Sequence, residues 1–188
     1  REFYKVDTIF IGGGTPSLID VKSLDQIYNT IQNNFQVSED VEFTIEANPE
    51  DITKHKVNEW ITLGVNRVSL GAQSFREKDL QYMNRIHTNK QIIDAISVLK
   101  KSIIDNISID LIYGFPLLTD KCWKNNLQKV ISFDIPHISC YCLTVENNTP
   151  LFFLIKNGKY GSLSTQQGKE HFVIARELLC QNGYNHYE

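Results

Sequence analysis

The sequence predicts an α/β protein built on parallel β-strands. Short β-branched and aromatic runs alternate with longer segments of helical periodicity, and nearly every predicted strand ends in a polar side chain or in glycine. Strand and helix alternating over five or six units imply parallel strands joined by right-handed crossovers. An open doubly wound sheet and a barrel both fit this pattern. The polar strand ends favour the barrel, which builds its site from the carboxyl ends of many strands.

The predicted strands cover residues 6–11, 41–47, 67–73, 108–114, 137–143 and 184–188. Apolar residues recur at helical spacing in three intervening segments. These stripes are Leu24, Ile27, Tyr28, Ile31 and Phe35; then Ile92, Ala95, Ile96 and Leu99; then Trp123, Leu127, Val130 and Ile131. Thr53 is a candidate N-cap for the helix before Gly64, and Gly183 follows the last helix as a C′ glycine would.

Composition narrows the class of protein. The chain has 188 residues, of which 41% are apolar, so it can bury a sizeable core as one domain or most of one. Its net charge is −3 and it has no run of Lys or Arg, which argues against a nucleic-acid or anionic-membrane partner. No apolar run approaches the ~18 residues of a membrane span, and residues 1–11 do not read as a signal peptide. We therefore expect a cytoplasmic protein, and both ends of the sequence look cut from a longer one.

Cysteine and histidine spacing predicts no metal site. Cys122, Cys140, Cys142 and Cys180 form neither a zinc-type pair nor a secreted disulfide framework, so we expect free thiols. The histidines are scattered without ligand spacing. His87 is expected to cap a helix or to face solvent.

Polar groups follow the apolar body of nearly every predicted strand. They are Gly12 to Thr15, then Glu46 and Asn48, then Gln73 and Ser74, then Asp110 and Tyr113, then Tyr141 and Thr144. Taken singly, Glu46 or Asp110 is more often structural than functional. Asp110 lies between Ile109 and Leu111 in a strand expected to be covered on both faces, where a buried charge needs a partner or a ligand.

The stretch "GGGTP", residues 12–16, is the sharpest local signal. It lacks the Lys of a P-loop and does not match GxGxxG, so phosphate fits it poorly. Consecutive glycines leave backbone N–H and C=O groups bare, which suits a small zwitterion bound through main-chain hydrogen bonds. A tight turn would explain one glycine more easily than three.

Five stretches in order carry a resemblance to a known family: "IFIGGGTPSLI", "FTIEANPEDIT", "RVSLGAQSF", "MNRIHT" and "SIDLIYGFPLLT". Together they resemble the radical S-adenosylmethionine (SAM) proteins of the oxygen-independent coproporphyrinogen III oxidase group, across residues 6–188. Within that group the chain looks most like the heme chaperone branch, HemW. The resemblance implies a partial (β/α) barrel of about six parallel strands.

The same resemblance implies a set of SAM contacts. The glycine loop would bind the amino acid end of SAM through Gly13, Gly14 and Thr15. Further contacts fall on Glu46, Gln73, Arg85 and Asp110. These side chains suit the chemistry of SAM, because carboxylates pair with its cationic groups and hydroxyls, Arg pairs with its carboxylate, and an amide pairs with a sugar or base edge.

The CxxxCxxC loop that holds the [4Fe-4S] cluster in this family does not occur in the sequence. In the family it follows the first barrel strand, just before the region where Arg1 begins. We therefore expect residues 1–188 to be a radical SAM core that lacks the first strand and the cluster loop, with the cluster ligands outside this chain.

Two functions follow from the resemblance. The first is a chaperone that binds heme and delivers it to a partner protein; "GAQSF" and "NRIHT" favour this branch. The second is an enzyme that converts coproporphyrinogen III to protoporphyrinogen IX by radical oxidative decarboxylation of two propionates. A third, weaker possibility is an unrelated barrel enzyme that uses the glycine loop for an anion.

Overall fold

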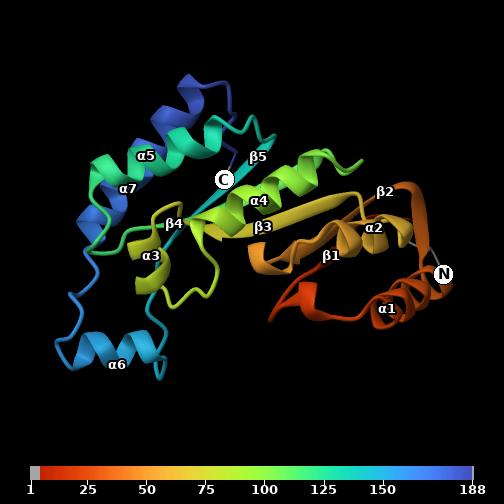
Figure 1. The fold of residues 1–188 in the computed structure, drawn as a ribbon, viewed down its shortest axis with the longest axis horizontal. Coiled ribbons are helices and arrows are strands. Elements are labelled where there is room, and N and C mark those ends of the chain that lie inside the picture. Colours follow the sequence, from red (N-terminus) through yellow and green to blue (C-terminus); the bar gives the residue numbers. More distant parts are fainter. Residues whose placement is uncertain (1–4, 188) are drawn as a thin grey trace. The chain divides into compact units, whose positions relative to one another are not determined.

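The computed structural model describes residues 5–187, which form one five-stranded sheet with the strand order β1-β2-β3-β4-β5 (Figure 1). β1 pairs with β2, and β2 with β3, in parallel. The elements in chain order are β1 (Lys5–Ile11), η1 (Pro16–Leu18), α1 (Val21–Asn34), β2 (Gln36–Ala47), η2 (Pro49–Asp51), α2 (Lys54–Thr62), β3 (Arg67–Gln73), α3 (Glu77–Tyr82), α4 (Asn89–Lys100), β4 (Asn106–Tyr113), α5 (Asp120–Ile131), β5 (His137–Cys142), α6 (Pro150–Lys156) and α7 (Thr165–Gln181).

The described chain divides into two compact units. Unit 1 comprises residues 5–72 and 90–109, and unit 2 comprises residues 73–89 and 110–187. The division therefore passes through β3 and β4. None of the helices in the described part of the chain has the length and apolar character that a bilayer crossing requires.

In unit 1 the alternation of side chains along β2 assigns the two faces of the sheet. The Tyr28 ring of α1 stacks on Phe43 with a centroid separation of 4.8 Å, so α1 covers the face that carries Phe43. Residues of a strand alternate between faces, which puts Thr44 and Glu46 on the opposite face. Glu46 consequently points away from the helical layer that covers Phe43.

Unit 2 is built around α5, α7 and the carboxyl half of β4. Trp123 of α5 is fully buried, its ring lies 5.4 Å from that of Tyr113, and its Nε1 donates to the carbonyl of His171 at 2.8 Å. α5 and α7 pack against each other (Figure 1). Burial of these aromatic surfaces supplies much of the hydrophobic stabilisation of the unit.

The predicted caps and turn glycines are confirmed. Thr53 Oγ1 accepts from the N–H of Lys56 at 3.2 Å at the start of α2, and Gly64 beyond its end has a φ of +93°. Gly183, with a φ of +88°, follows Asn182, the C-cap of α7.

The observed elements differ from the predicted ones in two places. β2 begins at Gln36 rather than at residue 41, and its pairing with β1 shifts register between Val6 and Thr8, where residues 38–41 of β2 stand opposite the single residue Asp7 of β1. Residues 184–187 form no strand, contrary to the prediction, and Glu188 lies outside the described residues.

Candidate functional site at the carboxyl ends of the strands

The three glycines after β1 meet two different steric requirements. Gly13 and Gly14 have φ of +82° and +63°, the left-handed region that side chains with a Cβ rarely adopt. Gly12 is needed for a close approach instead, because a Cβ there would lie 3.0 Å from Oε1 of Glu46. From the sequence we expected a turn to explain one of these glycines more easily than all three. In the structure the turn uses two of them, Gly13 and Gly14, and Gly12 serves the close approach.

Glu46 closes the glycine loop from the neighbouring strand. The backbone N–H of Gly13 donates to Oε2 of Glu46 at 3.1 Å, so this N–H is not bare as the sequence suggested. Space beside the loop is open, since no heavy atom lies within 4 Å of the Cβ position at Gly13 or Gly14. A carboxylate beside exposed backbone carbonyls is an acceptor set that suits an ammonium group.

A second cluster fixes the far end of the loop. Ser17 is fully buried, and its hydroxyl donates to Oδ2 of Asp51 at 2.6 Å. Lys56 Nζ donates to the carbonyl oxygen of Ser17, and the N–H of Asn48 donates to Oγ of Ser17 at 3.4 Å. The loop after β1 is thus tied to the segment that follows β2, the strand to which Glu46 belongs.

Gln73 ends β3 in a strained conformation. Its φ is +66°, which is uncommon for a residue with a Cβ, and its side chain is buried. Such a conformation persists only where the surroundings fix it, and non-glycine residues held in this region cluster at functional sites.

Asp110 lies on the face of β4 that points away from α5. Tyr113 faces Trp123 of α5, and alternation along the strand puts Asp110 on the other side. Asp110 is half-buried rather than fully buried. Burial, and secondly the charge of Asp110, raises the pKa of the Cys140 thiol to about 12. Cys140 therefore stays a neutral thiol at physiological pH.

Arg85 and His87 lie in the segment after α3. Arg85 is exposed, and its N–H donates to the carbonyl of Leu80 at 2.8 Å. His87 is 3% exposed, which corrects the expectation that it faces solvent. The exposed guanidinium of Arg85 is free to reach a carboxylate ligand through its five donors.

The four cysteines are free thiols, as predicted. Over residues 5–187, no group of three or more His, Cys, Asp or Glu side chains is placed to hold a metal ion. The described residues thus do not fit a [4Fe-4S] cluster, whose irons are held by cysteine thiolates.

A cavity of about 680 Å³ lies in unit 2 between β5, α7 and residues 182–187. Cys140, Phe172 and Arg176 are among its lining residues, whereas none of the seven candidate site residues lines it. The cavity is therefore separate from the predicted site.

The structure brings together part of the predicted set. In unit 1, Glu46 contacts Gly13, and Gly14 and Thr15 continue the same loop. Gln73, Arg85 and Asp110 belong to unit 2. The buried partners Ser17 and Asp51 were not predicted, because they lie 34 residues apart and carry no local signal of their pairing.

Sequential strands joined by helices, with a glycine loop after β1 and carboxylates near the strand ends, define an α/β protein of the (β/α) barrel type. The sequence profile of the radical SAM superfamily matches residues 1–130. The chain belongs to the radical SAM superfamily.

Two relatives illustrate the likeness. The chain is 35% identical over 187 residues to "Heme chaperone HemW" of Lactococcus lactis subsp. lactis, covering 100% of this chain and 49% of the relative. It is 39% identical over 186 residues to "Heme chaperone HemW" of Buchnera aphidicola subsp. Acyrthosiphon pisum, covering 97% of this chain and 47% of the relative. The chain thus spans about half the length of the curated relatives it matches.

Among solved structures, coproporphyrinogen III oxidase (HemN) from Escherichia coli, a radical SAM enzyme, matches with a TM-score of 0.80. The identity is 25%, and the match covers 96% of this chain and 42% of the oxidase. The five strands match this fold, so the predicted partial barrel is confirmed, with five strands in place of about six.

Proposed function

We propose that the chain forms the radical SAM core of a heme chaperone, a cytoplasmic protein that binds heme and delivers it to an acceptor protein. The observation that carries the proposal is sequence likeness over almost the whole chain. Relatives named heme chaperone HemW reach 35% and 39% identity, against 25% for the oxidase of known structure. The core is proposed to extend over residues 1–188, beyond the 130 residues of the family profile.

SAM is the proposed cofactor, and the glycine loop fits its amino acid end. The open space beside Gly13 and Gly14, with Glu46 and the backbone carbonyls as acceptors, suits the SAM ammonium group. In the family, SAM binds next to a [4Fe-4S] cluster and is the source of radical chemistry. Because this chain lacks CxxxCxxC, the ligands of such a cluster would come from other residues of the full-length protein.

The remaining candidate residues are assigned by chemistry. Thr15 would join Gly13 and Gly14 in the loop, and Arg85 would pair with the SAM carboxylate. Asp110 and Gln73 would bind ribose hydroxyls or the adenine edge. The orientation of Glu46 and Asp110, each away from a packed helix, supports these roles.

The alternative is an oxygen-independent coproporphyrinogen III oxidase. The structural likeness to the Escherichia coli enzyme favours it specifically. The two functions predict different products. An oxidase converts coproporphyrinogen III over many turnovers, whereas a chaperone releases heme unchanged.

The test uses full-length protein prepared anaerobically with its cluster reconstituted. Heme binding is followed by absorption spectroscopy, and heme transfer is followed by the spectrum of an apo-hemoprotein acceptor from the same organism. In parallel, coproporphyrinogen III, SAM and an electron acceptor are added, and porphyrins and 5′-deoxyadenosine are separated by chromatography.

We expect stoichiometric heme binding, transfer to the acceptor, and no protoporphyrinogen IX. Heme added to the acceptor without the protein, at the same free concentration, is the control for passive transfer. Multiple-turnover formation of protoporphyrinogen IX would contradict the chaperone proposal and establish the alternative.

A further inference from the structure

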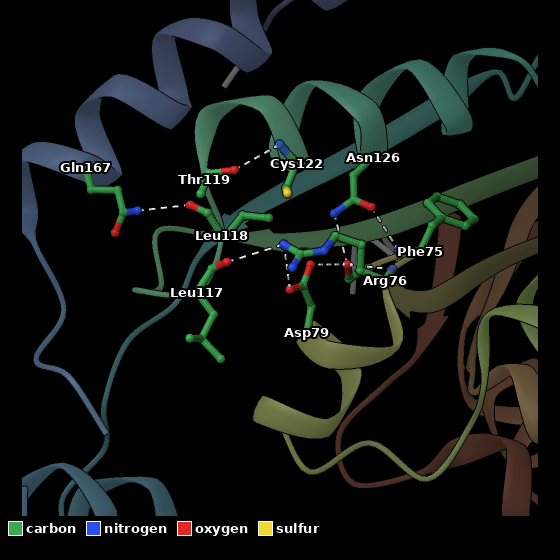
Figure 2. Close-up of polar contacts among 10 residues, drawn as sticks. Phe75, Arg76, Asp79, Leu117, Leu118, Thr119, Cys122, Asn126 and Gln167 are labelled. Atoms are coloured by element: carbon green, nitrogen blue, oxygen red, sulfur yellow. Dashed lines mark hydrogen bonds and ion pairs between the residues drawn. The ribbon is translucent and has the colours of Figure 1, made fainter. Parts of the chain in front are cut away.

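A buried polar network lies directly after Gln73 in unit 2 (Figure 2). Ser74 is its centre. Its hydroxyl donates to Oδ2 of Asp79 at 2.7 Å and accepts from Nδ2 of Asn126 at 2.9 Å. We call Ser74, Arg76, Asp79 and Asn126 the Asp79 network.

Asp79 places a carboxyl group in a fully buried position. Its side chain has no exposed surface, and burial raises the pKa of the carboxyl, opposed by the Ser74 hydrogen bond and the Arg76 charge. Nη1 of Arg76 lies 3.2 Å from Oδ1 of Asp79 and also donates to the carbonyl of Leu117 at 3.3 Å, as Figure 2 shows. Buried ion pairs are often no more stabilising than apolar residues of the same volume.

The network holds three consecutive residues. The N–H of Arg76 donates to Oγ of Ser74 at 3.2 Å, and the N–H of Phe75 donates to Oδ1 of Asn126 at 3.1 Å. Asn126 lies 52 residues beyond Ser74 on α5, so a helix of the packed core fixes the turn. Figure 2 shows both bonds of Asn126 converging on this turn.

The turn directly follows Gln73 in the chain. Gln73 has a φ of +66°, a strained conformation that persists only where neighbouring structure fixes it. Hydrogen bonds to Ser74, Phe75 and Arg76 supply that fixation on the carboxyl side. Without them, Gln73 would relax toward the extended region, and its amide would point elsewhere.

We propose that Asp79 is a positioning residue for SAM binding. Through Ser74 and Asn126 it holds the turn after β3, so that the Gln73 amide is presented to the ligand. The proposal rests on the proposed role of Gln73 as a SAM contact.

The test measures SAM affinity by isothermal titration calorimetry on anaerobic full-length protein with its cluster reconstituted. The variants are Gln73→Ala, Asp79→Ala, their double variant, and Asp79→Asn. Tyr184→Phe is the matched control, because it removes a 2.7 Å hydrogen bond to the carbonyl of Ile135 within the same unit and outside the network. Thermal unfolding of each variant is recorded alongside.

We expect Gln73→Ala and Asp79→Ala each to weaken SAM binding about tenfold, the loss of one hydrogen bond. The double variant should bind no more weakly than either single variant, because both changes remove the same contact. Asp79→Asn keeps an acceptor oxygen for Ser74 and should recover most of the affinity. Tyr184→Phe should lower the unfolding temperature without changing the affinity.

Unchanged affinity in a folded Asp79→Ala variant, with weakened binding in Gln73→Ala, would overturn the positioning role. Additive losses in the double variant would overturn it as well. Unchanged affinity in Gln73→Ala would remove the contact on which the proposal rests, while heme transfer, measured separately, would still decide the chaperone function. Should Asp79→Ala not fold, Ser74→Ala takes its place with the same expected non-additivity.

Discussion

At the scale of single residues, the glycine loop and Glu46 form one structural unit. Gly13 and Gly14 supply the left-handed turn, and Gly12 makes room for the carboxylate that receives the Gly13 N–H. One oxygen of Glu46 thus shapes the loop, and our proposal assigns the other to the SAM ammonium group. The arrangement explains why a side chain cannot replace any of the three glycines at no cost.

Gly12→Ala tests this arrangement. The added methyl would lie 2.9 Å from Cε1 of Phe10 and 3.0 Å from Oε1 of Glu46, so the Glu46 side chain has to move. We expect SAM affinity to fall about tenfold, as for the loss of one charge-assisted hydrogen bond, measured by calorimetry on full-length protein.

The matched control for Gly12→Ala is Gly161→Ala. The nearest atom to a Cβ at Gly161 is 3.4 Å away, on the Pro116 ring, and its φ lies outside the left-handed range. Both variants add one methyl group, and the affinity of the control should be unchanged. Equal affinities in both variants would show that Glu46 is not held by the space at Gly12.

At the scale of elements, periodicity predicted long elements well and short ones poorly. The apolar stripes of α4 and α5 are buried as predicted, at Ile92, Leu99 and Leu127 among others. The stripe of α1 is only partly covered, because Ile27 and Phe35 are 39% and 56% exposed. A stripe predicts which face of a helix is apolar, whereas its burial depends on what packs against it.

The short helices α3 and α6 were not predicted. α3 spans Glu77–Tyr82, too few residues for a helical period to show, and α6 has no buried residue. The buried network of Asp79 was missed for a different reason: Asn126, which donates to its partner Ser74, lies 52 residues further along the chain. Motif likeness named the candidate site residues, which stay a prediction, whereas no sequence pattern indicated the conformation of Gln73 or the bond from the Gly13 N–H to Glu46.

His171 of α7 makes the fold sensitive to acid. The ring is fully buried, and its Nδ1 accepts from the N–H of Gly114 at 3.2 Å, which requires an unprotonated nitrogen. Burial lowers the pKa of His171 below 6.5, although Asp120, with Oδ1 3.2 Å from Nε2, partly opposes the shift. The folded state therefore binds this proton less readily than the unfolded state does.

Stability from His171 is present above a pH of about 6.5 and is lost as the pH falls toward the lower pKa of the folded state. We expect the free energy of unfolding to fall between pH 7 and pH 5, by at most about 1.4 kcal/mol per pH unit from this one group. Urea unfolding at pH 5, 6 and 7 measures it. In His171→Gln, which does not titrate, the decline should be shallower. If the free energy of unfolding fell equally steeply with pH in His171→Gln and in the unsubstituted protein, the acid sensitivity would not come from His171.

At the scale of the whole molecule, the two units share continuous strands. β3 passes from unit 1 to unit 2 after Ala72, and β4 does so after Ile109. Unfolding either unit would therefore remove part of a strand on which the other depends, and strands of a sheet lose stability when their pairing is interrupted. This continuity predicts cooperative unfolding, unlike the behaviour of separate domains joined by a linker.

The two tryptophans of the chain report on one unit each. Trp60 of α2 lies in unit 1 and Trp123 of α5 lies in unit 2, and both are buried. In Trp123→Phe the fluorescence follows unit 1, and in Trp60→Phe it follows unit 2. For each variant we expect the urea midpoint of fluorescence to coincide with that of far-ultraviolet circular dichroism, which follows the whole chain.

Each substitution shifts the unfolding midpoint of its own variant by removing packing, so the comparison is made between the two probes within one variant. A fluorescence transition that precedes the dichroism transition in either variant would show that its unit unfolds independently, and that the shared strands do not couple the two.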